Sequence, residues 1–110
     1  MNWIPLTTED QLLDIEKKSS SKPQVIFKHS TRCSTSSMVL NRLERSKSSD
    51  AVDFYFLDLI QYRPISAQIA EKFHVAHESP QVLVIKNGSC TFDESHMAIN
   101  MDEILEQSAS

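Results

Sequence analysis

The chain has 110 residues, of which 40% are hydrophobic and 24% are charged, with a formal net charge of −4. Its length and composition are typical of one globular domain spanning residues 1–110 and argue against a disordered or fibrous chain. The acidic balance, with scattered basic residues, argues against binding to nucleic acid or to anionic membranes.

The first half of the chain predicts two helices with a strand between them. Residues 8–18 carry leucine and isoleucine among charged residues, with Thr8 as the expected helix cap. Residues 24–28 form a short run of β-forming residues, which is typical of a buried parallel strand. From residue 34 to about residue 46, apolar side chains recur at helical spacing.

The second half predicts three more strands and two more helices. Residues 52–59 are expected to form an interior strand, and a helix is expected from Pro64 to about residue 75. Residues 81–86 then lead to Asn87-Gly88, a strong hairpin signal, and residues 89–93 should return antiparallel. Asn100 is the expected cap of the last helix. Right-handed crossovers make the first two strands parallel, so the order indicates an α/β fold with a mixed four-stranded sheet flanked by helices.

Cys33 lies between the first predicted strand and the second predicted helix. The amide groups and dipole at a helix N-terminus favour thiolate over thiol, which makes Cys33 the candidate nucleophile. Arg32 and, if protonated, His29 would add positive charge, while Thr35 and Ser36 can supply hydrogen-bond donors. The alternative is that Cys33 packs as a small buried side chain.

The spacing Cys33-Ser34-Thr35-Ser36 has the length of a Cys-x-x-Cys motif but ends in serine. A site without this resolving thiol favours mixed disulfides with other molecules, which is monothiol chemistry. Cys90 falls on the predicted return strand and is interpreted as a structural thiol. The four histidines are scattered in the sequence and have no zinc-ligand spacing, so we expect no metal site.

Pro80 follows Ser79 at the start of a predicted strand. A plain strand-entry proline accounts for this position. If the Ser79-Pro80 bond is instead cis, the backbone of Ser79 turns toward the Cys33 loop and can pair with an extended substrate.

Several segments of the chain resemble the bacterial monothiol bacilliredoxins of the YtxJ type. They are Phe-Lys-His-Ser-Thr-Arg-Cys at 27–33, residues 70–75, residues 78–83, Lys86-Asn87-Gly88 and Ser95-His96. The resemblance implies a thioredoxin-like fold, a cis bond before Pro80, and a redox Cys33 that removes bacillithiol from protein mixed disulfides. The family typically has proline, isoleucine and serine after its cysteine, whereas this chain has Ser34, Thr35 and Ser36.

The implied function sets the expected partners. They are S-thiolated proteins and a low-molecular-weight thiol as co-substrate, with no resident cofactor and no nucleic acid or membrane. Ser36 and the Thr35 amide would steady the thiolate, with Arg32 nearby, and Ser79-Pro80 would align the substrate. We expect a monomer. The expected location is the cytoplasm, because the first residues do not form a signal peptide and no stretch is long enough to cross a bilayer.

Other functions remain as alternatives. A non-catalytic adaptor would use the surface around Cys33 and Pro80 for binding alone. An oxyanion reductase, for example of arsenate, would also use a nucleophilic thiol but needs further cysteines for turnover. Glutaredoxins that hold an iron-sulfur cluster prefer Cys-Gly-Phe-Ser, which this chain lacks.

Overall fold

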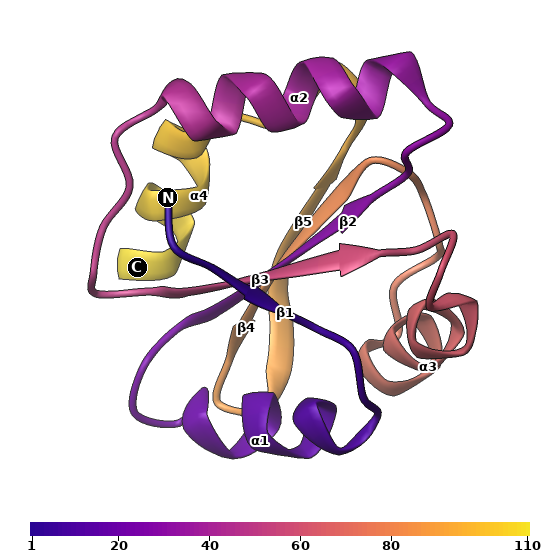
Figure 1. The fold of residues 1–110 in the computed structure, drawn as a ribbon. Helices are drawn as coiled ribbons and strands as arrows, with labels where there is room; N and C mark the ends of the chain where they lie inside the picture. The colour runs from indigo at the N-terminus through magenta and orange to yellow at the C-terminus, as the bar shows by residue number, and fades with distance from the viewer.

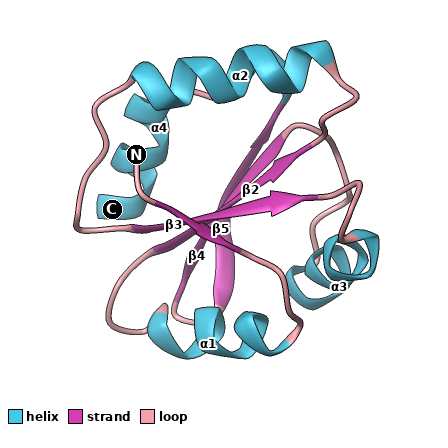
Figure 2. Ribbon diagram, viewed as in Figure 1, coloured by secondary structure: helices cyan, strands magenta, loops and turns pink.

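A five-stranded mixed sheet with the order β1-β3-β2-β4-β5 forms the centre of the protein, and helices cover both of its faces (Figure 1). The computed structural model describes all of residues 1–110. Its strands are β1 Trp3–Pro5, β2 Gln24–His29, β3 Asp53–Asp58, β4 Gln81–Lys86 and β5 Ser89–Ser95. The helices, shown in cyan in Figure 2, are α1 Asp10–Lys18, α2 Ser34–Arg45, α3 Arg63–Phe73 and α4 Met101–Ala109, with a short 3₁₀ turn at His96–Ala98.

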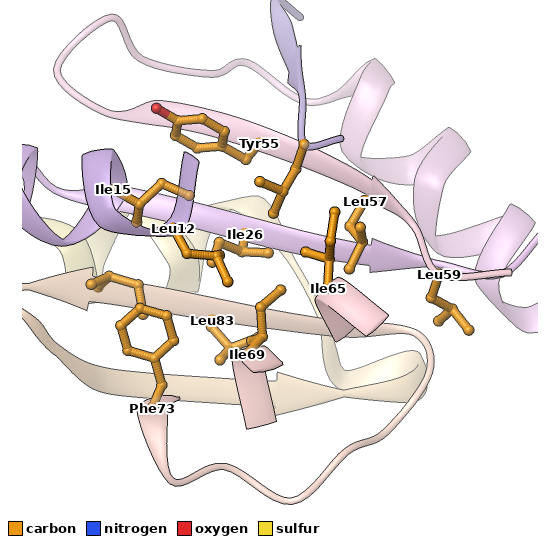
Figure 3. Close-up of a cluster of buried hydrophobic side chains, with 12 residues drawn as sticks. Leu12, Ile15, Ile26, Tyr55, Leu57, Leu59, Ile65, Ile69, Phe73 and Leu83 are labelled. Carbon is orange, nitrogen blue, oxygen red and sulfur yellow. The ribbon is translucent and has the colours of Figure 1, made fainter. Parts of the chain in front are cut away.

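The β2 strand is the central strand of the sheet, and its side chains alternate between two cores. It pairs in parallel with β3 and antiparallel with β4. Ile26 faces α1 and α3 together with Leu83 of β4, in the cluster drawn in Figure 3. Val25 and Phe27 face the opposite side, where α2 and α4 cover the sheet. All six residues of β2 are buried. A strand covered on both faces has apolar residues pointing to both sides, which explains the run of apolar residues between polar ends.

The predicted α/β fold is confirmed, but the sheet has five strands rather than four. The additional strand, β1, is only three residues long and ends in proline, so it carries little strand signal in the sequence. It pairs in parallel with the outer edge of β3. The Trp3 ring lies 5.7 Å from Phe27 and 5.6 Å from Phe56, measured between centroids. These aromatic contacts hold β1 on the sheet.

The predicted N-cap of the first helix is wrong by one residue. Helix α1 begins at Asp10 with Glu9 as its N-cap, and Thr8 does not cap it. Instead, the side-chain oxygen of Gln11 accepts the backbone N–H groups of Thr7 at 2.8 Å and Thr8 at 3.0 Å. The prediction for α4 is confirmed, since Asn100 Oδ1 accepts the Glu103 N–H at 2.9 Å.

The predicted hairpin is also confirmed. Asn87 and Gly88 have positive φ angles of 52° and 79°, as a tight turn between two antiparallel strands requires. The return strand β5 extends to Ser95, two residues beyond the predicted end. No helix combines the length and the apolar character needed to cross a membrane.

Candidate active site

Cys33 lies at the carboxyl end of β2, directly before the first residue of α2. Its backbone is extended, with φ −111° and ψ 117°, which is the usual conformation of an N-cap residue. Its N–H donates to Ser30 O at 3.2 Å, and its carbonyl accepts the Ser37 N–H at 3.1 Å. The thiol is free, half-buried and outside both hydrophobic clusters. The predicted placement is confirmed, and the alternative of an apolar buried Cys33 does not hold.

Ser36, three residues after Cys33, is fully buried and ties the end of β2 to the first turn of α2. Its Oγ accepts the Ser30 N–H at 3.1 Å and lies 2.7 Å from His29 Nδ1. The sulfur of Cys33 accepts no capping hydrogen bond from the helix. Ser36 therefore supports the cysteine loop through Ser30, the residue whose carbonyl binds the Cys33 amide.

His29 is almost fully buried, with 5% of its surface exposed. Burial lowers its pKa, although Asp58 and Glu44 act in the opposite direction. The imidazole is therefore neutral at neutral pH, and its Nδ1 shares a hydrogen bond with the Ser36 hydroxyl. His29 was expected to add positive charge beside Cys33 only if protonated, and at neutral pH this condition is not met. His29 instead contacts Ser36.

The two other residues predicted to lie beside the thiol flank it in the structure. Arg32 is exposed, and its side chain takes part in none of the ion pairs. Its backbone N–H donates to Ser30 Oγ at 3.3 Å. Thr35 is half-buried in the first turn of α2. Both residues remain candidates for contacts with a bound substrate.

The Ser79-Pro80 peptide bond is cis, as the family resemblance predicted. Lys28 of β2 pairs with Gln81 of β4, so Pro80 lies one step further along, beside His29 at the end of β2. This register brings Ser79 and Pro80 to the edge of the sheet where the Cys33 loop begins. The Ser79 hydroxyl is buried there without a hydrogen-bond partner.

Cys90 lies toward the opposite end of the sheet from Cys33. It pairs with Ile85, four residues along β4 from Gln81, whose partner Lys28 lies near the end of β2. At about 3.3 Å per residue, this offset alone is about 13 Å, whereas a disulfide needs Cα atoms within about 7 Å. Burial, assisted by Asp93, raises the pKa of the Cys90 thiol to about 11. Cys90 is therefore protonated at neutral pH and cannot resolve a disulfide on Cys33.

The structure also brings together residues that the sequence analysis did not select. The sequence analysis treated Lys28 only as the polar end of a strand and His77 only as one of four scattered histidines. In the structure, Lys28 Nζ lies 3.4 Å from His77 Nδ1. Their separation of 49 residues leaves no local signal for this contact. No three His, Cys, Asp or Glu side chains lie together in an arrangement that could hold a metal ion.

A cysteine at the start of the helix that follows a central strand, with a cis-proline at the same sheet edge, defines a thioredoxin-fold protein. Solved structures support this assignment. A thioredoxin-fold protein with a suggested oxidoreductase role is 30% identical, with a TM-score of 0.78 over 97% of this chain and 93% of that chain. Malassezia sympodialis thioredoxin is 20% identical, with a TM-score of 0.76 over 99% and 92%. Fasciola hepatica thioredoxin is also 20% identical, with a TM-score of 0.70 over 96% and 95%.

The family comparison is more specific than the fold. The model of the family described as monothiol bacilliredoxin BrxC matches residues 4–104. The chain therefore belongs to the monothiol bacilliredoxin family, as the sequence motifs indicated. Family and fold together identify it as a redox protein of the thiol oxidoreductase type.

Proposed function

We propose that the protein removes a low-molecular-weight thiol of the bacillithiol type from protein mixed disulfides, with Cys33 as the nucleophile. The observation that carries this proposal is that the half-buried thiol of Cys33 lies at a helix N-terminus with no second cysteine within disulfide distance. Ser36 occupies the position of a resolving cysteine, and Cys90 lies too far away to form a disulfide with Cys33. Such a site forms mixed disulfides with other molecules.

The proposed cycle has two exchange steps. The Cys33 thiolate attacks the small-thiol sulfur of a protein mixed disulfide, so the bond from Cys33 to the small thiol forms and the protein thiolate leaves. A second small thiolate then attacks the sulfur bound to Cys33 and leaves as a symmetrical disulfide, which restores the Cys33 thiolate. Over the cycle one disulfide is consumed and one is formed: the protein sulfur is reduced to a thiolate, the incoming free small thiol is oxidised in its place, and the small-thiol sulfur that came from the substrate stays in a disulfide throughout.

The neighbouring residues have distinct roles in this cycle. The N-terminus of α2 favours the attacking and leaving thiolate of Cys33 through its dipole. Ser36 holds the loop through His29 and Ser30, so the sulfur stays at the helix N-terminus. Ser79 offers its backbone beside Pro80 to an extended segment of the substrate protein, as an additional strand would.

The test uses intact mass spectrometry. The reduced protein is incubated with oxidised bacillithiol or oxidised glutathione, and the expected result is one small-thiol adduct on wild type and on Cys90→Ser. Cys33→Ser should gain none. A second assay follows release of the same thiol from an S-thiolated carrier protein. An absent adduct on wild type, or an equal adduct on Cys33→Ser, would contradict the proposal.

The adaptor alternative makes the opposite prediction. An adaptor would bind its partner equally well as wild type and as Cys33→Ala, and it would release no thiol from the carrier protein. Measuring both properties on the same two proteins separates the two functions, because exchange requires the sulfur and docking does not.

A further inference from the structure

Lys28 is a buried cation close to the candidate active site. It lies on β2 and has no exposed surface. By strand alternation it faces the α1 and α3 side of the sheet, as Ile26 does. None of the chain's three ion pairs includes it, and its hydrogen-bond partner is a neutral acceptor, His77 Nδ1, at 3.4 Å. A buried ammonium without a carboxylate is costly, so its presence calls for a physical reason.

A small pocket lies beside this lysine. Its volume is about 280 Å³, and it is lined by Leu59, Arg63, Ser66, Ala67 and His77. His77 forms the link to Lys28, since its Nδ1 also lies 3.3 Å from Ser66 Oγ. The polar groups of its wall are therefore the exposed Arg63, the imidazole of His77 and the largely buried hydroxyl of Ser66, beside apolar surface. Lys28 is not part of the wall and is connected to it through His77.

The charges around His77 show that this corner is locally positive. Burial lowers the pKa of His77, and the positive charges of Lys28 and Arg63 lower it further. Glu78 acts in the opposite direction, and one of its carboxylate oxygens lies 3.4 Å from His96 Nε2. The N-terminus of α3, which begins at Arg63 and has no side-chain cap, adds the positive end of its dipole. The positive corner contrasts with the net charge of −4 of the whole chain.

Leu59 and Arg63 of the pocket wall follow the end of β3 at Asp58, and Cys33 follows the end of β2 at His29. Because β2 and β3 are parallel and His29 pairs with Asp58, the two chain segments leave the sheet at the same edge. The N–H of Leu59, on the pocket wall, donates to His29 O at 3.0 Å. The next residue, Ser30, accepts the Cys33 N–H. His77 stands two residues before Ser79. The pocket wall is therefore linked to the cysteine loop by backbone hydrogen bonds through the neighbouring residues His29 and Ser30.

We propose that this pocket binds a carboxylate of the small thiol that Cys33 exchanges. The inference rests on the proposed function for its substrate, but the binding site itself stands on Lys28, Arg63, Ser66 and His77. A volume of about 280 Å³ suits a group of a few heavy atoms and is smaller than a typical drug-sized site. Arg63 would hold the carboxylate oxygens by charge-assisted hydrogen bonds, with Ser66 and His77 as further donors, and Lys28 would act through its contact with His77.

The first test measures anion binding without redox chemistry. Cys33→Ser protein is titrated with succinate, and separately with inorganic phosphate, at constant ionic strength, while the backbone amide signals of Ser66 and Ala67 are followed by NMR. Succinate should shift these signals to saturation and bind more tightly than phosphate. Adding Lys28→Met or Ser66→Ala should weaken succinate binding about tenfold, the loss expected for one charge-assisted contact.

The matched control is Lys72→Met, the same substitution near the other end of α3, which should leave succinate binding unchanged. Tighter binding of phosphate would overturn the carboxylate assignment. The proposed site would be overturned if succinate binding did not saturate, or if Lys28→Met and Ser66→Ala bound succinate as tightly as the parent Cys33→Ser protein does.

The second test connects the pocket to Cys33. Exchange rates are compared for oxidised glutathione, which carries carboxylates, and for the uncharged bis(2-hydroxyethyl) disulfide. The ratio of the first rate to the second should fall about tenfold in Lys28→Met and stay constant in Lys72→Met. If Cys33 reacts but the ratio does not change, the inference fails and the proposed function stands. If Cys33 reacts with neither disulfide while succinate binds, the proposed function fails and the anion site stands.

Discussion

Replacing Lys28 by methionine should make the protein more stable. Methionine has a similar length and no charge, so it fills the buried space under α3 without the ammonium. Burial lowers the pKa of Lys28 from 10.5 to about 8. Since one pKa unit corresponds to about 1.4 kcal/mol, keeping this lysine charged at neutral pH costs roughly 3 kcal/mol of folding free energy. The contact with His77 is long and recovers only a small part of that cost.

The pH dependence of stability gives the sharper measurement. Between pH 8 and 10.5 the unfolded chain holds the Lys28 proton and the folded chain has released it, so the wild-type free energy of unfolding gains a contribution that rises with pH. Lys28→Met lacks this contribution. Cys90 and Tyr55, whose pKa values are raised by burial, act in the opposite direction but titrate in both proteins. Their effects cancel when the two pH profiles are subtracted.

Urea unfolding at pH 7 and pH 9 is the assay. We expect Lys28→Met to exceed wild type by up to about 3 kcal/mol at pH 7, and the difference to shrink by about 1 kcal/mol at pH 9. Lys72→Met, a change at a partly exposed lysine, should stay within about 0.5 kcal/mol of wild type at both pH values. A Lys28→Met protein that is less stable than wild type, or a difference that is independent of pH, would refute the argument that burial opposes the charge.

Three further predictions concern individual contacts. Ser36→Ala removes a buried hydroxyl that bonds His29 and a backbone amide, so the free energy of unfolding should fall by about 1–3 kcal/mol in urea melts. The exposed Ser34→Ala is its matched control, and an equal loss in both would contradict the role of Ser36. Because burial lowers the pKa of His29 and His77, the unfolded chain binds more protons below about pH 6.5, and stability should fall from pH 7 to pH 5. His77→Gln should flatten that decline, and a parallel pH profile would count against it. Asn100→Ala should lower the urea midpoint by the equivalent of about 1 kcal/mol, since the cap of α4 is lost, and an unchanged midpoint would show the cap to be dispensable.

Signals between neighbouring residues predicted the parts of the fold that depend on local conformation. Asn87-Gly88 predicted the hairpin because these residues accept positive φ angles at low cost. Asn100 predicted the start of α4 because its side chain reaches an amide three residues further on. The position of Cys33 followed from the change between strand and helical patterning, and the structure confirms it.

Local signals failed where the partner is far away in the sequence. The three residues of β1 form a strand because β3 offers a free edge and the Phe27 and Phe56 rings pack against Trp3. The cap predicted at Thr8 failed for a local reason instead: the side chain of Gln11, three residues further on, accepts the amides of Thr7 and Thr8 before α1 begins. The β1 strand does not follow from propensity, because tertiary contacts outweigh differences of a few tenths of a kcal/mol per residue.

The sequence by itself determined the order of helices and strands, the family, and the position of Cys33 at the start of a helix. Each of these depends on residues that are close together in the chain. Only the tertiary structure decided what surrounds that thiol. In the structure His29 is a buried neutral partner of Ser36, and Lys28 contacts His77, which lies 49 residues away in the sequence. The charge state and hydrogen-bond partners of a side chain depend on burial and on neighbours from other elements, and these exist only after the sheet and α3 have packed together.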